Sequence, residues 1–460
     1  MIKKILLINP PETQQNDFSG PPLGLLYLAG TLLGAGFEVA IIDGCLTGWE
    51  AVAQKIKNFQ PDLVGVPCLT PGRQKSLRAA QIVKQINPNI LVVLGGAHAT
   101  IMYRQLLENY PAVDICVLGE GEQTMLEIAQ GRPWLEIVGL AFRKNGRVIL
   151  TPPRKYVADL DHIPFPAWHL VDLQKYPPRG RGTINGVDLS REPRVSVIFS
   201  RGCVGRCNFC STWWIWRGWR HRSAKNMADE IELLQKKYGV RHLCFADDTL
   251  TVKRQPILDL CAEIKRRKLQ IAFHVTTRAD CVDVEVLRAL RSAGCYEIAY
   301  GIETGSAQLL VRMEKGVSPQ VARQAIALTK EAGIKNTVLL IAGSLGETAE
   351  TINKTVRFLR ATNPEHVGSV GGLWILPGTR VYFEAKKAGL LGDAFWLGNQ
   401  PFLLYTLEHP RWELAIFDWA LRTKTLLSRW KIVNLIKAVP HFSRLFLRGV
   451  KSKLKYWFQK

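Results

Sequence analysis

Apolar and polar positions alternate regularly through the first 128 residues of the chain. Short apolar runs, typical of buried strands, are separated by segments of helix length with helical periodicity. The predicted strands span residues 5–8, 38–43, 63–66, 90–94 and 114–118. The predicted helices span residues 23–34, 49–58, 73–86, 101–108 and 122–129. Five such alternations predict a doubly wound α/β domain with a parallel sheet, in which ligands bind beyond the carboxyl ends of the strands.

The loops at those carboxyl ends are rich in glycine and other small residues. Glycine lets the backbone approach a flat or phosphate-bearing ligand, and helix amino termini favour anionic groups. The candidate binding residues in these loops are Asn9, Pro10, Leu69, Thr70, Gly95, Gly96, His98, Gly119 and Glu120. Two alternatives stay open: glycines also form tight turns, and a histidine in the position of His98 is more often a packing or hydrogen-bonding residue than a metal ligand.

Residues 141–193 lose the alternation and collect prolines and glycines, which predicts a linker. The alternation then resumes, with predicted strands at 195–200, 241–246, 270–276, 295–302, 336–341 and 366–375. Six β/α units predict a partial (β/α)6 barrel of the TIM type, whose chemistry lies on the loops after the strands. The expected domains are therefore residues 1–140, the linker 141–193, the barrel 194–385 and a basic helical segment 386–460.

Ten cysteines occur in the chain, and seven of them lie singly in apolar segments, where cysteine acts as a small hydrophobe. The other three, Cys203, Cys207 and Cys210, form a C-x3-C-x2-C loop just past a predicted strand. Three thiolates can hold a 4Fe-4S cluster and leave one iron with an open coordination site. A structural zinc site requires four ligands, for which His221 is the alternative fourth; the spacing favours the cluster.

This loop, with Phe209 before its third cysteine, resembles the signature of the radical S-adenosylmethionine (SAM) superfamily. The resemblance implies that the three cysteines bind a 4Fe-4S cluster and that SAM chelates the open iron. It also implies reductive cleavage of SAM to a 5'-deoxyadenosyl radical, with electrons from an external donor of the flavodoxin or ferredoxin type. No further catalytic side chain is assigned by the resemblance.

Segments after the later strands resemble the SAM-binding motifs of the same superfamily. Asp247 and Asp248 match the acidic stretch near the SAM amino group, and Glu303 matches the acid that reaches the ribose or methionine part. Arg278 is the candidate partner of the SAM carboxylate. The full set of implied SAM-binding residues is Phe209, Asp247, Asp248, Arg278, Glu303, Gly343 and Glu347, the last two near adenine.

The amino-terminal part resembles the Rossmann-like cobalamin (B12)-binding domain that is fused to a large radical SAM subgroup. The matching segments are Ile8 to Pro11, Pro21 to Ala29, Gly95 to Thr100 and Leu118 to Glu122. The resemblance implies cobalamin as a second cofactor, contacted by the candidate loop residues given above. Other cobalamin domains place a cobalt-binding histidine in an Asp-x-His-x-x-Gly loop after the first strand. Residues 12–20 contain no histidine, so the sequence predicts no such ligand there.

The subgroup contains B12-dependent radical SAM methyltransferases and the anaerobic magnesium-protoporphyrin monomethyl ester cyclase. The implied function is cobalamin-dependent methyl transfer to an unactivated centre of a small or lipid-like metabolite, and the alternative is oxidative cyclisation or skeletal rearrangement. Methylthiolation of tRNA would require a second set of three cysteines. A non-catalytic cobalamin sensor would leave the cysteine loop unexplained. We therefore favour these last two functions less.

The net charge of +22 is concentrated in the tail, because residues 419–460 carry eleven Lys or Arg and no Asp or Glu. Basic amphipathic helices with aromatic residues can bind anionic membranes, while the alternative is a helical cap packed on the barrel. No RNA-binding signature accompanies the charge, so nucleic acid is not an expected partner. No long uncharged apolar run or cleavable leader occurs. We expect a cytoplasmic protein, with peripheral contact to the inner membrane face as one interpretation of the tail.

Overall fold

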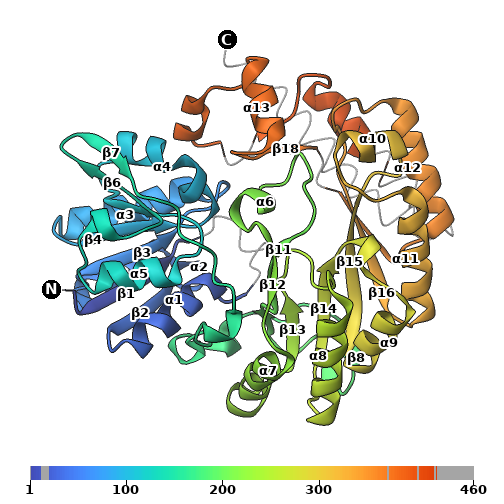
Figure 1. The fold of residues 1–460 in the computed structure, drawn as a ribbon, viewed down its shortest axis with the longest axis horizontal. Helices are drawn as coiled ribbons and strands as arrows, with labels where there is room; N and C mark the ends of the chain where they lie inside the picture. Colours follow the sequence, from blue (N-terminus) through green and yellow to red (C-terminus); the bar gives the residue numbers. More distant parts are fainter. Residues whose placement is uncertain (1, 12–19, 370–371, 401–402, 419–420, 422–460) are drawn as a thin grey trace.

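The computed structural model describes residues 2–11, 20–369, 372–400, 403–418 and 421. Two α/β units lie side by side, with the amino-terminal unit in blue and cyan and the second unit in green to orange (Figure 1). No helix among the described residues is long and apolar enough to cross a membrane. Most of the basic tail, residues 422–460, lies outside the described residues, and so do the helices expected there.

The first unit contains a seven-stranded sheet of order β2-β1-β3-β4-β5-β6-β7. Its strands are β1 (Lys4–Asn9), β2 (Glu38–Asp43), β3 (Leu63–Pro67), β4 (Leu91–Gly95), β5 (Ile115–Val117), β6 (Leu140–Lys144) and β7 (Arg147–Leu150). The first five are parallel, as predicted, whereas β6 and β7 add an antiparallel edge. The sheet therefore extends to Leu150, past the boundary expected at residue 140, and the expected linker begins with two strands.

Helices cover both faces of this sheet, which confirms the doubly wound architecture. They are α1 (Leu23–Gly34), α2 (Gly44–Phe59), α3 (Arg73–Ile86), α4 (Ala97–Asn109) and α5 (Glu122–Ala129). One face packs against α1 and α5, and the other packs against α2, α3 and α4. Central strands are apolar on both faces, and the side chains of Ile5 to Ile8 are 0% exposed. This double burial explains why the strands occur as continuous apolar runs in the sequence.

The second unit contains six parallel strands of order β10-β13-β14-β15-β16-β17, an arrangement consistent with the expected partial barrel. These strands are β10 (Arg194–Val197), β13 (His242–Phe245), β14 (Ala272–Thr277), β15 (Cys295–Glu303), β16 (Lys335–Leu340) and β17 (His366–Ser369). The helices outside them are α7 (Ala224–Tyr238), α8 (Arg254–Arg266), α9 (Val284–Ser292), α10 (Ala307–Arg312), α11 (Pro319–Glu331) and α12 (Ala349–Thr362).

The first strand of the barrel is shorter than predicted, because the chain leaves the sheet before the cysteines. β10 ends at Val197, and the buried Asp247 carboxylate accepts the backbone N–H groups of Phe199 and Ser200. The chain then enters a separate antiparallel hairpin of β11 (Ser200–Cys203) and β12 (Gly218–His221). The cysteine loop therefore follows a strand of this hairpin rather than the barrel strand that we expected over 195–200.

The strand predicted over 366–375 is also divided. Its first part is β17, and its second part, β18 (Trp374–Ile375), pairs instead with β19 (Leu403–Leu404) outside the barrel. Between β18 and β19 lie α13 (Arg380–Lys387) and the short helix η7 (Asp393–Leu397). Figure 1 shows α13 and β18 near the top, between the two units.

The segment that contains η7 fastens the second unit to the first. Trp396 is 1% exposed, and Arg73 of α3 donates to the carbonyl oxygens of Trp396 and Gly398, each at 2.7 Å. Farther along, a helix over residues 411–418 places Leu414 and Phe417 in the barrel core. The described beginning of the carboxyl-terminal segment is therefore a cap on the barrel.

Candidate active site

A cavity of about 790 Å³ separates the carboxyl edge of the first sheet from the hairpin that leads to the cysteines. Loops after β1, β3, β4 and β5 form one wall, and residues of β10, β11 and the loop after β13 form the other. The predicted site residues that line it are Asn9, Leu69, Gly95, Gly96, Gly119 and Asp248. Many of the other lining side chains are apolar, including Leu28, Val66 and Trp216. The cavity therefore suits a broad, largely apolar ligand held between the two units.

The remaining candidates of the first unit are buried and do not line this cavity: Pro10, Thr70, His98 and Glu120. His98 is 1% exposed, and its Nδ1 forms a 3.1 Å hydrogen bond with Thr70 Oγ1. Its ring meets Trp396 edge-on, with centroids 6.1 Å apart. Burial lowers the pKa of His98 to about 3, so the imidazole is neutral. In this position it is a packing residue of the interface with Trp396.

Glu120 and Glu122 join the loop after β5 to the cysteine hairpin through two arginines. Arg201 contacts Glu120 at 2.9 Å and Glu122 at 2.5 Å, and Arg220 contacts Glu120 at 2.9 Å. The four side chains are only 3% to 15% exposed. We call this group the arginine joint. The sequence analysis missed Arg201, although its position two residues before Cys203 was a usable signal.

The cysteine loop begins at the end of β11. Position 202 requires glycine, because its φ is +93° and a Cβ there would meet the Gly218 carbonyl oxygen at 2.0 Å. The Sγ atoms of Cys203 and Cys207 lie 3.5 Å and 3.7 Å from the place that a Cβ on Gly205 would take. These two thiols therefore face the same small space, and all three thiols are half-buried and free of disulfides.

The number of thiols bears on which metal group they fit. A 4Fe-4S cluster can take three protein thiolates and leave one iron with an open coordination site. A structural zinc ion takes four protein ligands. Three half-buried thiols on one loop therefore fit a 4Fe-4S cluster better than a structural zinc ion.

A buried ion pair lies beside the cysteine loop. Lys315 Nζ contacts Glu303 Oε1 at 2.7 Å, and both side chains are about one-tenth exposed. Glu303 has a φ of +65°, and the absence of a side chain at Gly301 leaves room for its carboxylate. Arg278 donates to Asp280 at 2.8 Å and 2.9 Å and to the Lys315 carbonyl oxygen at 3.0 Å. Lys315 follows α10 outside any recognisable motif, so it could not be predicted from the sequence.

The two adjacent aspartates after β13 have different surroundings. Asp247 is 4% exposed, accepts hydrogen bonds from Phe199 and Ser200, and holds the base of the cysteine hairpin. Burial raises the pKa of Asp247 to about 7. Asp248 instead reaches the cavity and accepts a 3.1 Å hydrogen bond from Thr212 Oγ1. Of the pair, only Asp248 faces the space where a ligand can bind.

The other implied SAM-binding residues are covered by the carboxyl-terminal segment. A Cβ added to Gly343 would lie 2.0 Å from the Leu414 side chain. The carboxylate of Glu347 is buried and accepts a hydrogen bond from the Thr351 hydroxyl. Phe209 packs in an apolar cluster with residues of α13 and β18. The structure thus brings the cysteines, Asp248, Glu303 and Arg278 to one edge and places Gly343 and Glu347 beneath the cap.

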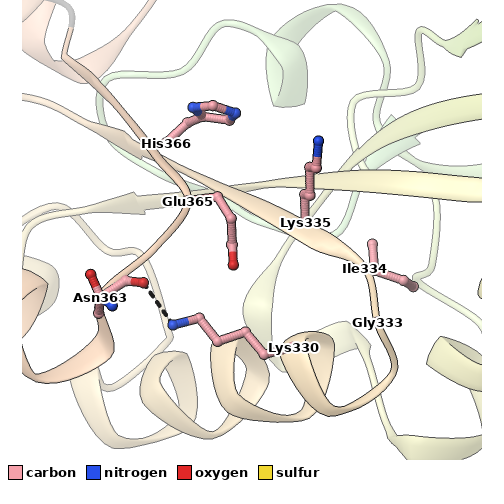
Figure 2. Close-up of a pocket in the computed structure, with 7 residues that line it drawn as sticks. All are labelled: Lys330, Gly333, Ile334, Lys335, Asn363, Glu365 and His366. Atoms are coloured by element: carbon pink, nitrogen blue, oxygen red, sulfur yellow. Dashed lines mark hydrogen bonds between the residues drawn. The ribbon is translucent and has the colours of Figure 1, made fainter. Parts of the chain in front are cut away.

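A second depression lies at the opposite edge of the barrel (Figure 2). It is bounded by the ends of α11 and α12 and the starts of β16 and β17, where Lys330 donates to the carbonyl oxygen of Asn363 at 2.6 Å. Chemistry in β/α barrels is located at the carboxyl edge, and residues at the amino edge contribute stability. This depression is therefore not the candidate site.

Two family comparisons agree with the two units. The B12 binding domain family matches residues 16–129, and the Radical SAM superfamily matches residues 197–359. An uncharacterized methyltransferase of Pyrococcus horikoshii is 32% identical over 475 aligned positions, which cover 100% of this chain and 99% of the relative. The chain belongs to the B12-binding radical SAM proteins.

Further similarities lie within this family of B12-binding radical SAM proteins. The anaerobic magnesium-protoporphyrin IX monomethyl ester cyclase of Rubrivivax gelatinosus is 34% identical over 359 residues, which cover 75% of this chain and 63% of the cyclase. The radical SAM methyltransferase TsrM of Kitasatospora setae, solved with cobalamin and a 4Fe-4S cluster, superposes with a TM-score of 0.69 at 22% identity. That match covers 84% of this chain and 75% of TsrM. Membership confirms the expected cofactors of this B12-binding radical SAM protein: a 4Fe-4S cluster, SAM and cobalamin.

The arginine joint predicts strong coupling between Arg201 and Glu122. In a double-mutant cycle with Arg201→Met and Glu122→Gln, we expect a coupling energy of about 1–3 kcal/mol, because Arg201→Met leaves the buried Glu122 carboxylate without its partner and Glu122→Gln leaves Arg201 with Glu120 alone. Urea denaturation of the four proteins measures it. The exposed pair Arg104 and Glu108, changed to Met and Gln, is the control, with expected coupling below about 0.5 kcal/mol. Equal coupling energies in the two pairs would contradict the strong coupling predicted for the arginine joint.

The buried His98 predicts a specific pH dependence of stability. Its folded-state pKa of about 3 lies below its ordinary value of 6.5, so the unfolded chain binds the proton first as the pH falls. The His98 contribution is complete above pH 6.5 and is lost as the pH falls towards 3. The unfolding free energy of the parent protein should fall as the pH is lowered from 7 to 4.5. In His98→Gln this fall should be smaller by on the order of 2 kcal/mol. His162→Gln, at an exposed site, is the control; identical pH profiles for His98→Gln and the parent protein would refute the prediction.

Proposed function

We propose that this protein is a cobalamin-dependent radical SAM methyltransferase that acts on an unactivated centre of a small metabolite. The observation that carries the proposal is the shared cavity, whose walls are the ligand-binding edge of the B12-binding unit and the hairpin of the cysteine loop. A methyl carrier and a radical source must both reach the same substrate atom. A cavity lined by both units supports that arrangement.

Cys203, Cys207 and Cys210 are the proposed ligands of the 4Fe-4S cluster. Their spacing and half-buried thiols suit a cluster that is reduced from outside, and Val204 and Trp214 beside the loop are 49% and 43% exposed. This exposed region is where we place the contact with a flavodoxin-type or ferredoxin-type donor. When bound, the cluster supplies the electron that cleaves SAM, and cobalamin supplies the carrier for the methyl group.

Asp248, Glu303 and Arg278 are the proposed SAM contacts that reach the site directly. Asp248 can accept a hydrogen bond from the SAM amino group in the cavity. Glu303 is held by Lys315, which orients its carboxylate beside the loop. Asp247 acts as a positioning residue, since its hydrogen bonds fix the chain just before the cysteines. Phe209, Gly343 and Glu347 remain proposed contacts, for which local packing gives no direct support.

The corrin is proposed to lie against the backbone of the loops after β1, β3, β4 and β5. Asn9, Leu69, Gly95, Gly96 and Gly119 line that wall, and no atom would lie within 4 Å of a Cβ added to Gly95 or Gly119. This open, largely apolar surface suits a flat macrocycle. Pro10, Thr70 and His98 are buried beneath this wall and do not line the cavity. Glu120 forms part of the arginine joint.

Methyl transfer is favoured over cyclisation by the extent of the similarity. The Pyrococcus methyltransferase matches over 99% of its length, whereas this chain spans 63% of the cyclase. Oxidative cyclisation remains the second candidate because the identity to the cyclase is 34%. We further propose a cytoplasmic enzyme. Membrane contact through the basic tail stays a proposal about residues 422–460, outside the described part.

The cluster assignment predicts the behaviour of cysteine variants. After anaerobic reconstitution, the triple variant with Cys203, Cys207 and Cys210 changed to Ala should retain almost no iron and form no 5'-deoxyadenosine, because its thiolate ligands are missing. Cys281→Ala, at a nearby half-buried cysteine outside the loop, is the control. It should retain its iron and form 5'-deoxyadenosine as the parent protein does. Unaltered iron content and SAM cleavage in the triple variant would overturn the assignment.

The methyl-transfer assignment predicts which products form from labelled SAM. A reduced, cobalamin-loaded protein should release about one S-adenosylhomocysteine per chain before any substrate is added, since the methyl group moves to the carrier. The same protein without cobalamin should release none. Chromatography of the products distinguishes this from 5'-deoxyadenosine. Formation of 5'-deoxyadenosine alone by the cobalamin-loaded protein would reject the methyltransferase and favour the cyclase-type reaction.

A further inference from the structure

The inner faces of four neighbouring barrel strands carry a ring of polar side chains at one level. The strand register places Ser196 beside Cys244, Cys244 beside His274, and His274 beside Glu297. All four residues are partly exposed, although their strand neighbours on the outer face, such as Val195 and Phe273, belong to the core. The ring therefore faces an accessible lumen and not the packed side of the barrel.

Arg194 lies one level below this ring, at the start of β10. Its register neighbour is His242, and its Nε is buried without a hydrogen-bond partner. Glu192, two residues earlier, pairs with Arg241, and Arg194 forms no ion pair with any described residue. Arg194 as a whole is partly buried, and its guanidinium also donates a hydrogen bond to the Tyr296 hydroxyl, so the Nε–H is the group left without a partner. A buried N–H of this kind costs free energy unless a ligand or water accepts its hydrogen bond.

The histidine and tyrosine side chains around Arg194 are uncharged. Burial and the charge of Arg194 lower the pKa of His242 to about 4 and that of His274 to about 3, so both rings are neutral. His242 Nε2 forms a 3.0 Å hydrogen bond with the Tyr296 hydroxyl. The one carboxylate of the ring, Glu297, accepts from Thr337 at 2.5 Å. The lumen thus has a cationic end at Arg194 and an anionic point at Glu297.

The floor of the barrel is closed below Arg194. The hairpin of β8 (Thr183–Ile184) and β9 (Val187–Asp188) packs Val187 and Leu189 against Ala272 and Tyr296. Asn185 also donates to the Ile271 carbonyl oxygen at 3.0 Å. The accessible side of the polar ring therefore faces upward, toward the carboxyl edge of the barrel.

The lumen above the ring connects with the cavity between the units. The inner positions of the next levels are mostly small, namely Ala246, Thr276, Ala299 and Gly301. Leu339 lies near the carboxyl end of β16 beside the inner position Gly301, and its side chain is 38% exposed. Ser196 of the ring and Ala246 are also lining residues of the 790 Å³ cavity. A small molecule can enter the lumen from the cavity and reach the ring.

We propose that Arg194, together with the neutral donor groups of the polar ring and away from the Glu297 carboxylate, binds an anionic group, a carboxylate or a phosphate, of the substrate. The inference rests on the proposed function, and it narrows the substrate class to small polar anions. Three residues of strand at about 3.3 Å each separate Arg194 from the end of β10, so the anionic group lies roughly 10 Å below the carboxyl edge. A hydrocarbon chain in the same place would desolvate Arg194 and Glu297 without replacing their hydrogen bonds, which disfavours a lipid-like substrate.

The test uses the full chain with its reconstituted cluster and SAM, and three probes of known charge. Succinate and inorganic phosphate carry the proposed anions, and succinamide is the neutral analogue of succinate. Isothermal titration should give millimolar binding of at least one anion and none of succinamide. Arg194→Gln should weaken that binding at least tenfold, while Arg194→Lys should stay within about threefold, because it keeps the charge. Arg357→Gln, on the exposed face of α12, should bind as the parent does.

A second measurement on the parent protein locates the anion independently of any variant. The ring signals of His242 and His274 in a histidine-labelled sample should shift on addition of the binding anion, while exposed His162 should not. Binding of succinate alone would indicate a carboxylate, and binding of phosphate alone would indicate a phosphate. Absence of anion binding, equal binding of succinamide, unchanged binding in Arg194→Gln, or histidine signals that do not move would each overturn the subsite.

These outcomes are separable from those that test the proposed function. The titration does not depend on SAM cleavage or methyl transfer. Anion binding at Arg194 in a protein that releases no S-adenosylhomocysteine would reject the methyltransferase and leave the subsite. Normal release of S-adenosylhomocysteine without anion binding would reject the subsite and leave the methyltransferase.

Discussion

The contact of Arg201 with Glu120 and Glu122 is the interaction on which the geometry of the site depends. The hairpin of β11 and β12 belongs to neither large sheet, so its position is not set by a strand ladder of either unit. On one side Asp247 holds its base, and on the other side the arginine joint fixes it to the loop after β5. Because these charges are buried, they favour one arrangement strongly, and the distance between the cysteine loop and the B12-binding wall follows from it.

A second contact also holds the two units together. Interfaces between domains of one chain commonly permit relative motion. Here Arg73 and Trp396 fasten the segment after α13 to the first unit, while the arginine joint fastens the cysteine hairpin. A single attachment would let the two units rotate about it as a hinge. Two separate attachments define the orientation of one unit relative to the other. The cavity between the units can therefore keep its shape when ligands enter and leave.

The sequence was sufficient for features that depend on local pattern. Strands such as β1 and β3 are continuous apolar runs, because both faces of the sheet are buried, and the cysteine spacing is a short motif. It was insufficient wherever a distant residue decides the outcome. Asp247 ends β10 early, Leu414 covers Gly343, and Glu120 binds arginines instead of facing the cavity. Lys315 beside Glu303 has no local signature at all, since only the fold brings the two together.

The two parts of the internal space differ in polarity, and this difference constrains the chemistry. The cavity wall of the first unit is largely apolar, while the barrel lumen below Ala246 is ringed by Ser196, Cys244, His274 and Glu297. A substrate anchored at the polar end presents its other end near the boundary, next to Asp248 and the cysteine hairpin. Polar anchoring and radical chemistry on an unactivated carbon are then compatible in one molecule, because the polar group that supplies binding lies away from the atom that reacts.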